Sequence, residues 1–172
     1  MDWQQLIIDV LRRSWDTLEK ALTNLSQDDL NKQPHPDSNS MGWLTWHLSR
    51  TQDRAIASIT GDQQIWIKDN WYTKFHLSAD TQDTGFGHTS QDVTKFKSPK
   101  PETLLEYYRA VLGRTEQYLV GLSTTELERK LDHPRVTSVE AWLAAVLYDT
   151  LQHSGQVAYL RGLLKGKGWW KG

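Results

Sequence analysis

The chain has 172 residues and a mass of 19.9 kDa, which suits one domain with a hydrophobic core that needs no cross-links. Its 20 Lys and Arg against 21 Asp and Glu give a net charge of -1, so no basic excess favours nucleic acid as a partner. The absence of cysteine excludes disulfides, thiolate metal sites and a cysteine nucleophile. No apolar run approaches a membrane span and the N-terminus is unlike a secretory signal, so we expect no membrane contact and a cytoplasmic location.

Four stretches of the sequence carry apolar residues at helical spacing. They run from Trp3 to about Leu25, from Ser40 to Gly61, from Pro101 to Gly121, and from Ser138 to about Lys165. Serine before a periodic stretch and proline in the first turn are typical of helix starts, and glycine is typical of helix ends. We therefore predict an all-α fold, a four-helix bundle, with residues 1–172 forming a single domain.

The connection between the second and third predicted helices, residues 61–100, is unusually long. It contains Gly85-Phe-Gly87, several aromatic residues, and one short helical candidate near residues 90–96. Long connections in compact domains are usually functional or mobile, so this crossover is a candidate lid over the bundle.

A weak internal repeat suggests how the helices are connected. Asn24-Leu-Ser-Gln-Asp-Asp-Leu30 aligns with Gly121-Leu-Ser-Thr-Thr-Glu-Leu127 at an offset of 97, and each leads into a helix containing Trp-Leu. Two similar helix pairs joined by a long crossover favour an up-down-down-up path. The match is short, so chance is the alternative explanation.

Asp149 and His153 lie one turn apart on an apolar stripe of the fourth predicted helix. Side chains at i and i+4 project side by side, so these two can converge on one cation. His47, at the edge of the apolar stripe of the second helix, could supply a third ligand, leaving positions open for water or substrate. The alternative is a buried hydrogen-bonded Asp149–His153 pair with His47 facing solvent.

Other polar residues give weaker signals. His88, after Gly-Phe-Gly, is the better of the two crossover histidines for a site that closes over the metal, and a surface position is the alternative. Arg50 and Asp53 follow His47 by three and six positions, so they either support it or form a solvated face. No nucleophile triad, phosphate loop or dinucleotide fingerprint is present.

Several motifs together resemble the DinB-like superfamily of metal-binding four-helix bundles, which includes mycothiol- and bacillithiol-dependent transferases. The motifs are Leu25-Ser-x3-Leu30, Ser40-Met-Gly-Trp43-Leu-x-Trp-His47-Leu, Thr84-Gly-x-Gly-His88-Thr, Leu104-Leu-x-Tyr-Tyr108 and His153-x-Gly155-Gln156-x2-Tyr159-Leu-Arg161-Gly162. The resemblance covers nearly the whole chain.

The resemblance implies a divalent metal ion, nickel, zinc or iron, held by His47, Asp149 and His153. The position of Asp149 is commonly histidine, and glutamate in mycothiol-type members, so the ligand here is one methylene shorter than glutamate. The implied activity is S-transfer, in which the metal activates a low-molecular-weight thiol for attack on a small electrophilic substrate, with Arg161 and His88 binding the cofactor or substrate. A homodimer is also expected. A non-catalytic stress-response or ligand-binding bundle and a metal-dependent hydrolase are the alternatives.

Overall fold

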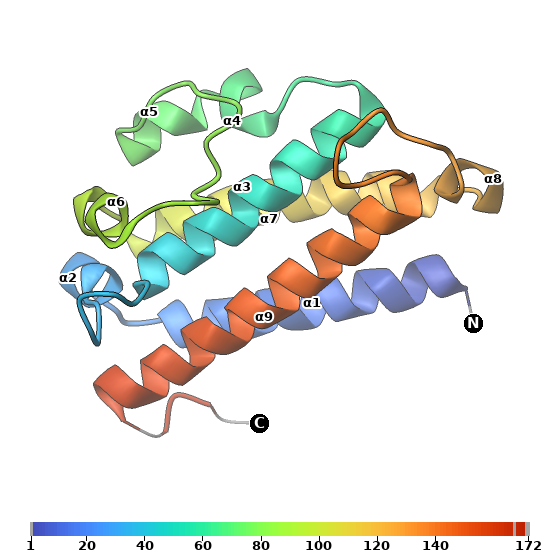
Figure 1. Ribbon diagram of the computed structural model, residues 1–172. Coiled ribbons are helices and arrows are strands. Elements are labelled where there is room, and N and C mark those ends of the chain that lie inside the picture. The colour runs from blue at the N-terminus through green and yellow to red at the C-terminus, as the bar shows by residue number, and fades with distance from the viewer. Residues whose placement is uncertain (1, 167, 171–172) are drawn as a thin grey trace.

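The computed structural model describes residues 2–166 and 168–170, and nearly all of their regular structure is helical (Figure 1). The long helices are α1 (Trp3–Leu22), α3 (Met41–Thr60), α7 (Pro101–Val120) and α9 (Val139–Lys165). The described residues form no strand beyond an isolated bridge between Lys130 and Ser138. The prediction of an all-α fold is confirmed. No helix in the described part of the chain is long and apolar enough to cross a membrane.

The ends of the long helices follow from local side-chain chemistry. The side chains of Asp2, Ser40 and Ser138 accept hydrogen bonds from the first backbone N–H groups of α1, α3 and α9. Pro101 occupies the first turn of α7, where its missing N–H costs no hydrogen bond. Gly61 ends α3 in the left-handed conformation, with φ of 77°.

Helix α3 packs against both α7 and α9, and α1 packs against the same two helices. Figure 1 shows α1 and α9 running in one direction and α3 and α7 running in the other. Helix α3 lies deepest, because every residue from 41 to 50 is buried, including charged and polar ones. The surface that α3 shares with α9 contains His47, Asp149 and His153.

The internal repeat corresponds to two short helices, α2 (Gln27–Asn31) before α3 and α8 (Thr124–Leu127) before α9. Ser26 caps α2 by accepting from the N–H of Asp29, and Ser123 caps α8 by accepting from the N–H of Glu126. The matching Leu-Ser-x3-Leu segments thus encode equivalent capped turns at the same place in each half.

The crossover contains three short helices where the sequence indicated one: α4 (Ile65–Lys68), α5 (Trp71–Phe75) and α6 (Ser90–Lys95). It packs down through aromatic side chains, since Trp66, Trp71 and Phe75 are buried and each lies within 5.6 Å of the Tyr107 ring between centroids. Helices of four or five residues are too short to show a periodic apolar pattern, which is why the sequence did not reveal α4 and α5.

Arg50 and Asp53 hold the crossover against α3, and the interpretation of these two residues as a solvated face is wrong. Both side chains are fully buried. Asp53 accepts hydrogen bonds from the backbone N–H groups of Ile65 and Trp66, at 2.9 Å each, and Arg50 donates to the backbone carbonyls of residues 80, 81 and 83. The pair thereby fixes both ends of the segment that leads to Thr84.

Candidate metal centre

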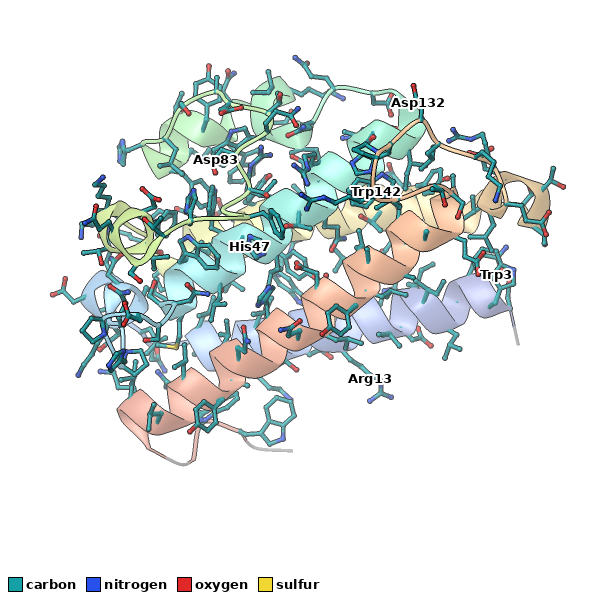
Figure 2. The ribbon with its side chains drawn as sticks, viewed as in Figure 1. Trp3, Arg13, His47, Asp83, Asp132 and Trp142 are labelled. Atoms are coloured by element: carbon teal, nitrogen blue, oxygen red, sulfur yellow. The ribbon has the colours of Figure 1, made fainter. Side chains whose placement is uncertain are left out.

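Three predicted ligands converge on the surface between α3 and α9. His47 comes from α3 and Asp149 and His153 from α9, and one ligand atom from each lies within 4.8 Å of the other two. Asp149 Oδ1 is 3.5 Å from His47 Nε2 and 3.3 Å from His153 Nε2. Figure 2 shows His47 on α3 at the seam with α9. Its exposed fraction is 6%, so the alternative in which His47 faces solvent is wrong.

Each histidine is oriented by a hydrogen bond at its other ring nitrogen. His47 Nδ1 donates to the backbone carbonyl of Thr84 in the crossover. His153 Nδ1 donates to the side-chain oxygen of Gln156 at 2.6 Å, one turn further along α9. Because Nδ1 carries the proton in both neutral rings, both Nε2 lone pairs point to the same place, which is the arrangement typical of histidine ligands.

The cluster is electrostatically suited to a cation. Burial acts to raise the pKa of Asp149, but in the absence of a metal ion its contacts with the imidazoles of His153 and His47, which can protonate at Nε2, outweigh burial and hold that pKa at about 2. Burial acts to lower the pKa of His153, but contacts with Asp149 and Gln156 raise it above the usual value. The carboxylate is therefore ionised at neutral pH and favours a positive charge between itself and the two imidazoles.

The spacing of the two Nε2 atoms from Asp149 Oδ1 fits a tetrahedral coordination shell. Metal–ligand bonds of about 2.0–2.2 Å place neighbouring donor atoms of a tetrahedral site about 3.3 Å apart. The two measured separations from Asp149 Oδ1 are close to that value, so aspartate reaches the two histidines despite its shorter side chain. Asp149 Oδ2 is buried without a hydrogen-bond partner among the described residues, leaving it available to a cation or a bound ligand.

Aromatic rings shield the His47 side of the cluster. The Trp43 ring stacks on the His47 imidazole, with centroids 4.8 Å apart and an angle of 9° between the planes. Gly85, next to Thr84, lies against the Trp43 and Trp46 rings, where a β-carbon would come within 2.7 Å and 2.9 Å of ring carbons. Glycine with φ of +83° thus lets the crossover backbone approach closely enough for the Thr84 carbonyl to reach His47.

The two residues expected to bind a cofactor lie outside the cluster. His88 accepts from Trp43 Nε1 at its Nδ1 and contacts Asp83 through Nε2, so it lies on the Trp43 side of His47. Arg161 follows His153 by eight positions, about 12 Å along α9, and lines a separate cavity with Lys20 and Trp169. Its Nε and Nη1 are buried without partners in the described part of the chain. Cofactor binding by these residues stays a prediction.

Three contributors to the site were not identified from the sequence. Gln156 was noted only as part of a motif, although its i+3 spacing from His153 is the signal for a contact across one helical turn. Trp43 stands four positions before His47 on α3, and this spacing likewise indicates a contact across one helical turn. The Thr84 carbonyl carried none, because every residue has a carbonyl and the contact joins positions 37 apart.

Comparison with known proteins identifies the family of this chain. The family model described as the DinB superfamily matches residues 11–157, a span that contains all three converging residues. A crystal structure of a conserved protein of locus from Enterococcus faecalis superposes with a TM-score of 0.88, at 27% identity over 97% of this chain and 99% of that chain. Among curated proteins, none matches closely enough to count as a relative. The chain belongs to the DinB superfamily.

Proposed function

We propose that this protein is a divalent-metal-dependent enzyme in which His47, Asp149 and His153 hold the ion and a low-molecular-weight thiol is transferred to an electrophile. The observation that carries the proposal is the convergence of two oriented Nε2 atoms on one carboxylate oxygen. Nickel, zinc and iron all accept imidazole and carboxylate ligands, so the donor set suits any of them. The active molecule on this proposal is a single-domain, up-down-down-up four-helix bundle in the cytoplasm.

Three protein ligands leave coordination positions open, as in catalytic rather than structural sites. When bound, the metal lowers the pKa of a thiol or water that coordinates it, so that the anionic nucleophile exists near neutral pH. The chain's own contribution is to hold both imidazoles in the ligating tautomer and to exclude water from His47 with Trp43. With the thiol proton released to solvent, the sulfur would form a bond to the electrophilic carbon, whose leaving group would depart with the bonding electrons.

Metal content tests the ligand assignment. Protein purified without chelator is expected to contain about one divalent ion per chain, and His47→Ala, Asp149→Ala and His153→Ala are each expected to lose it. His76→Ala is a matched control, because His76 is an exposed histidine at the end of α5. Equal metal in the ligand variants and the control contradicts the assignment and favours the non-catalytic bundle.

Thiol dependence tests the reaction. The metal-loaded protein is expected to conjugate an electrophilic dye to one of several low-molecular-weight thiols, and the rate is expected to rise with thiol concentration until it saturates. A hydrolase that uses bound hydroxide would release product from activated esters or amides at a rate independent of thiol. That result would assign hydrolysis rather than thiol transfer to the protein, and the metal-site assignment would be unaffected.

A further inference from the structure

A further cavity lies where α3 meets the start of α9, on the side of the metal centre nearer the C-terminal end of α3. It has a volume of about 380 Å³, and side chains from α3, the crossover, the loop before α9 and the first turn of α9 line it. Among the lining residues are Arg54, His133 and Trp142. Figure 2 shows Trp142 on α9 below the loop that carries Asp132.

Two side chains that line this cavity carry a neutral N–H donor without an acceptor among the described residues. Trp142 is 6% exposed, and its Nε1–H is buried without a hydrogen-bond partner among the described residues. His133 Nδ1 accepts from the backbone N–H groups of Arg135 and Val136, so in the neutral ring the proton must be on Nε2, which becomes a donor. The Trp142 N–H is costly to bury without an acceptor, so a small rotation of the ring toward a ligand in the cavity is favoured, whereas the His133 Nε2 is not among the buried unpartnered atoms and can bind such a ligand directly.

The cavity also carries positive charge without a nearby carboxylate partner. Arg54 is partly buried, and its one hydrogen bond in the described structure is a 3.4 Å contact with the Gln82 carbonyl. Burial, followed by repulsion from Arg50 and Arg135, lowers the pKa of its guanidinium. Within the described residues, neither Arg54 nor Arg135 forms an ion pair. The lining carboxylate, Asp62, is paired with Arg114 at 3.3 Å.

We infer that this cavity binds an oxyanion, the carboxylate or phosphate group of a small molecule, between Arg54, His133 and Trp142. Arg135, whose guanidinium lies over the Phe86 ring, adds positive charge from outside the lining. Guanidinium and neutral N–H donors together match the lone pairs of such a group. The positive charge that the fold leaves uncompensated at Arg54 is then neutralised by the ligand.

The position of the cavity gives a length for the substrate, an inference that rests on the proposed function. Arg54 follows His47 by seven residues on α3, and Trp142 precedes Asp149 by seven on α9. Seven residues are about two helical turns, or about 10 Å, and return to nearly the same face. A molecule with its reacting thiol or electrophile at the metal centre would place an anionic group about 10 Å away in this cavity.

Calorimetric titration of the metal-free protein with inorganic phosphate and with malonate, at constant ionic strength, tests the oxyanion site. Saturable binding of at least one probe is expected, and its identity separates phosphate from carboxylate recognition. Arg54→Gln, Arg135→Gln and Trp142→Phe are each expected to weaken binding about tenfold. Arg13→Gln, at an exposed arginine on α1, is the control and is expected to bind as the unchanged protein does.

The inference is overturned if neither probe binds saturably, or if the cavity variants bind as tightly as the Arg13→Gln control. Arg135 is exposed, so its variant keeps the test valid if Arg54→Gln does not fold. His47→Ala protein is expected to bind the anion normally, which separates failure of this site from failure of the metal centre. In Co²⁺-loaded protein, relaxation of the phosphate ³¹P signal is expected to give a metal–phosphorus distance of about 10 Å. A distance typical of direct coordination would contradict binding in this cavity.

Discussion

Arg50 and Asp53 are fully buried one turn apart on α3, and Arg50 Nη1 lies 3.6 Å from Asp53 Oδ2. Around them, Tyr107 donates its hydroxyl to Asp53 at 2.9 Å and the Gln64 side-chain oxygen accepts from Arg50 at 2.8 Å. Both charges are thus compensated inside the protein, and most of their partners are in the crossover. The pair links the α3 residues that follow His47 to the segment that supplies the Thr84 carbonyl.

Removing one member of this pair is expected to destabilise the fold strongly. Asp53→Ala leaves Arg50 buried without its carboxylate and leaves the N–H groups of Ile65 and Trp66 without an acceptor. We expect a loss of about 3–5 kcal/mol in the free energy of unfolding, measured by urea denaturation. Glu19→Ala is the control, because its side chain is 49% exposed and pairs with the 69% exposed side chain of Arg109, so a loss below about 1 kcal/mol is expected. Equal losses would show that burial of the pair has no special role.

Gln156 is expected to tune metal affinity through His153. Gln156→Leu removes the acceptor that fixes the Nδ1 proton, so metal affinity should fall about 10- to 100-fold. Gln156→Glu keeps an acceptor at the same place and should retain affinity. Competition with a chromogenic chelator measures both, and Gln152→Leu, at an exposed position on the preceding turn, is the control. An unchanged affinity in Gln156→Leu would mean that the hydrogen bond does not orient the ring.

Gly85 and Gly87 form a matched pair for testing the approach of the crossover to His47. Both have positive φ, +83° and +84°, so alanine is strained by about 1–2 kcal/mol at either position. Only at Gly85 does the added carbon collide with Trp43 and Trp46, which should cost a further 1–3 kcal/mol or so. Gly85→Ala should therefore lower both the unfolding free energy and the metal affinity more than Gly87→Ala. Identical behaviour would rule out close packing at Gly85 as the reason for glycine.

The ion pair between Asp29 of α2 and Lys165 at the end of α9 predicts an acid-dependent stability. The 2.7 Å contact with Lys165, against the opposing effect of burial, lowers the pKa of Asp29 to about 2. Because the folded state favours the carboxylate, this contribution is present above about pH 4 and is lost as the pH falls toward 2. Both side chains are partly exposed, so it amounts to about 1 kcal/mol or less.

Urea denaturation of Lys165→Met should show this deficit at pH 6 and none near pH 2. Lys20→Met is the control, since the Lys20 ammonium lies over the Trp170 ring rather than beside a carboxylate. A deficit in Lys165→Met that does not change with pH would exclude the ion pair as its source.

The outer face of α9 is expected to mediate a homodimer. It exposes four large apolar side chains that lie within one arc of the helix: Tyr148, Leu151, Tyr159 and Leu163. Large exposed apolar side chains along one arc of a helix favour burial against a second copy of the chain. Leu151→Glu should shift the mass in light scattering from dimer to monomer, whereas Gln117→Glu, on α7, should not. A monomeric unchanged protein would contradict the dimer.

The sequence was sufficient for features that depend on nearby residues. Helix-capping serines and the glycine after α3 mark boundaries because they act within one turn of the helix. The Asp149–His153 contact follows from i and i+4 spacing on one helix. His47 could be added because only one other buried helix carried a histidine close to its apolar stripe.

Features that depend on distant partners could not be predicted in the same way. Charged residues are normally exposed, so Arg50 and Asp53 gave no sign that Tyr107 and Gln64 would compensate them in the core. The cavity proposed to bind an oxyanion combines Arg54 with His133 and Trp142, which follow it by 79 and 88 positions along the chain. Their proximity depends on how the crossover and the loop before α9 pack, and no local pattern encodes that packing.

The imidazole rings of His47 and His153 are oriented by acceptors on different parts of the chain. His153 is oriented by Gln156 on its own helix, so its orientation persists whenever that turn of α9 is formed. His47 is held by the Trp43 ring on its own helix, but its tautomer is fixed by Thr84, so local opening of the crossover would remove the acceptor for its Nδ1 proton. Metal affinity is therefore expected to depend on how stably residues 61–100 pack on α3, and a ligand that stabilises this packing is expected to strengthen metal binding without touching the ion.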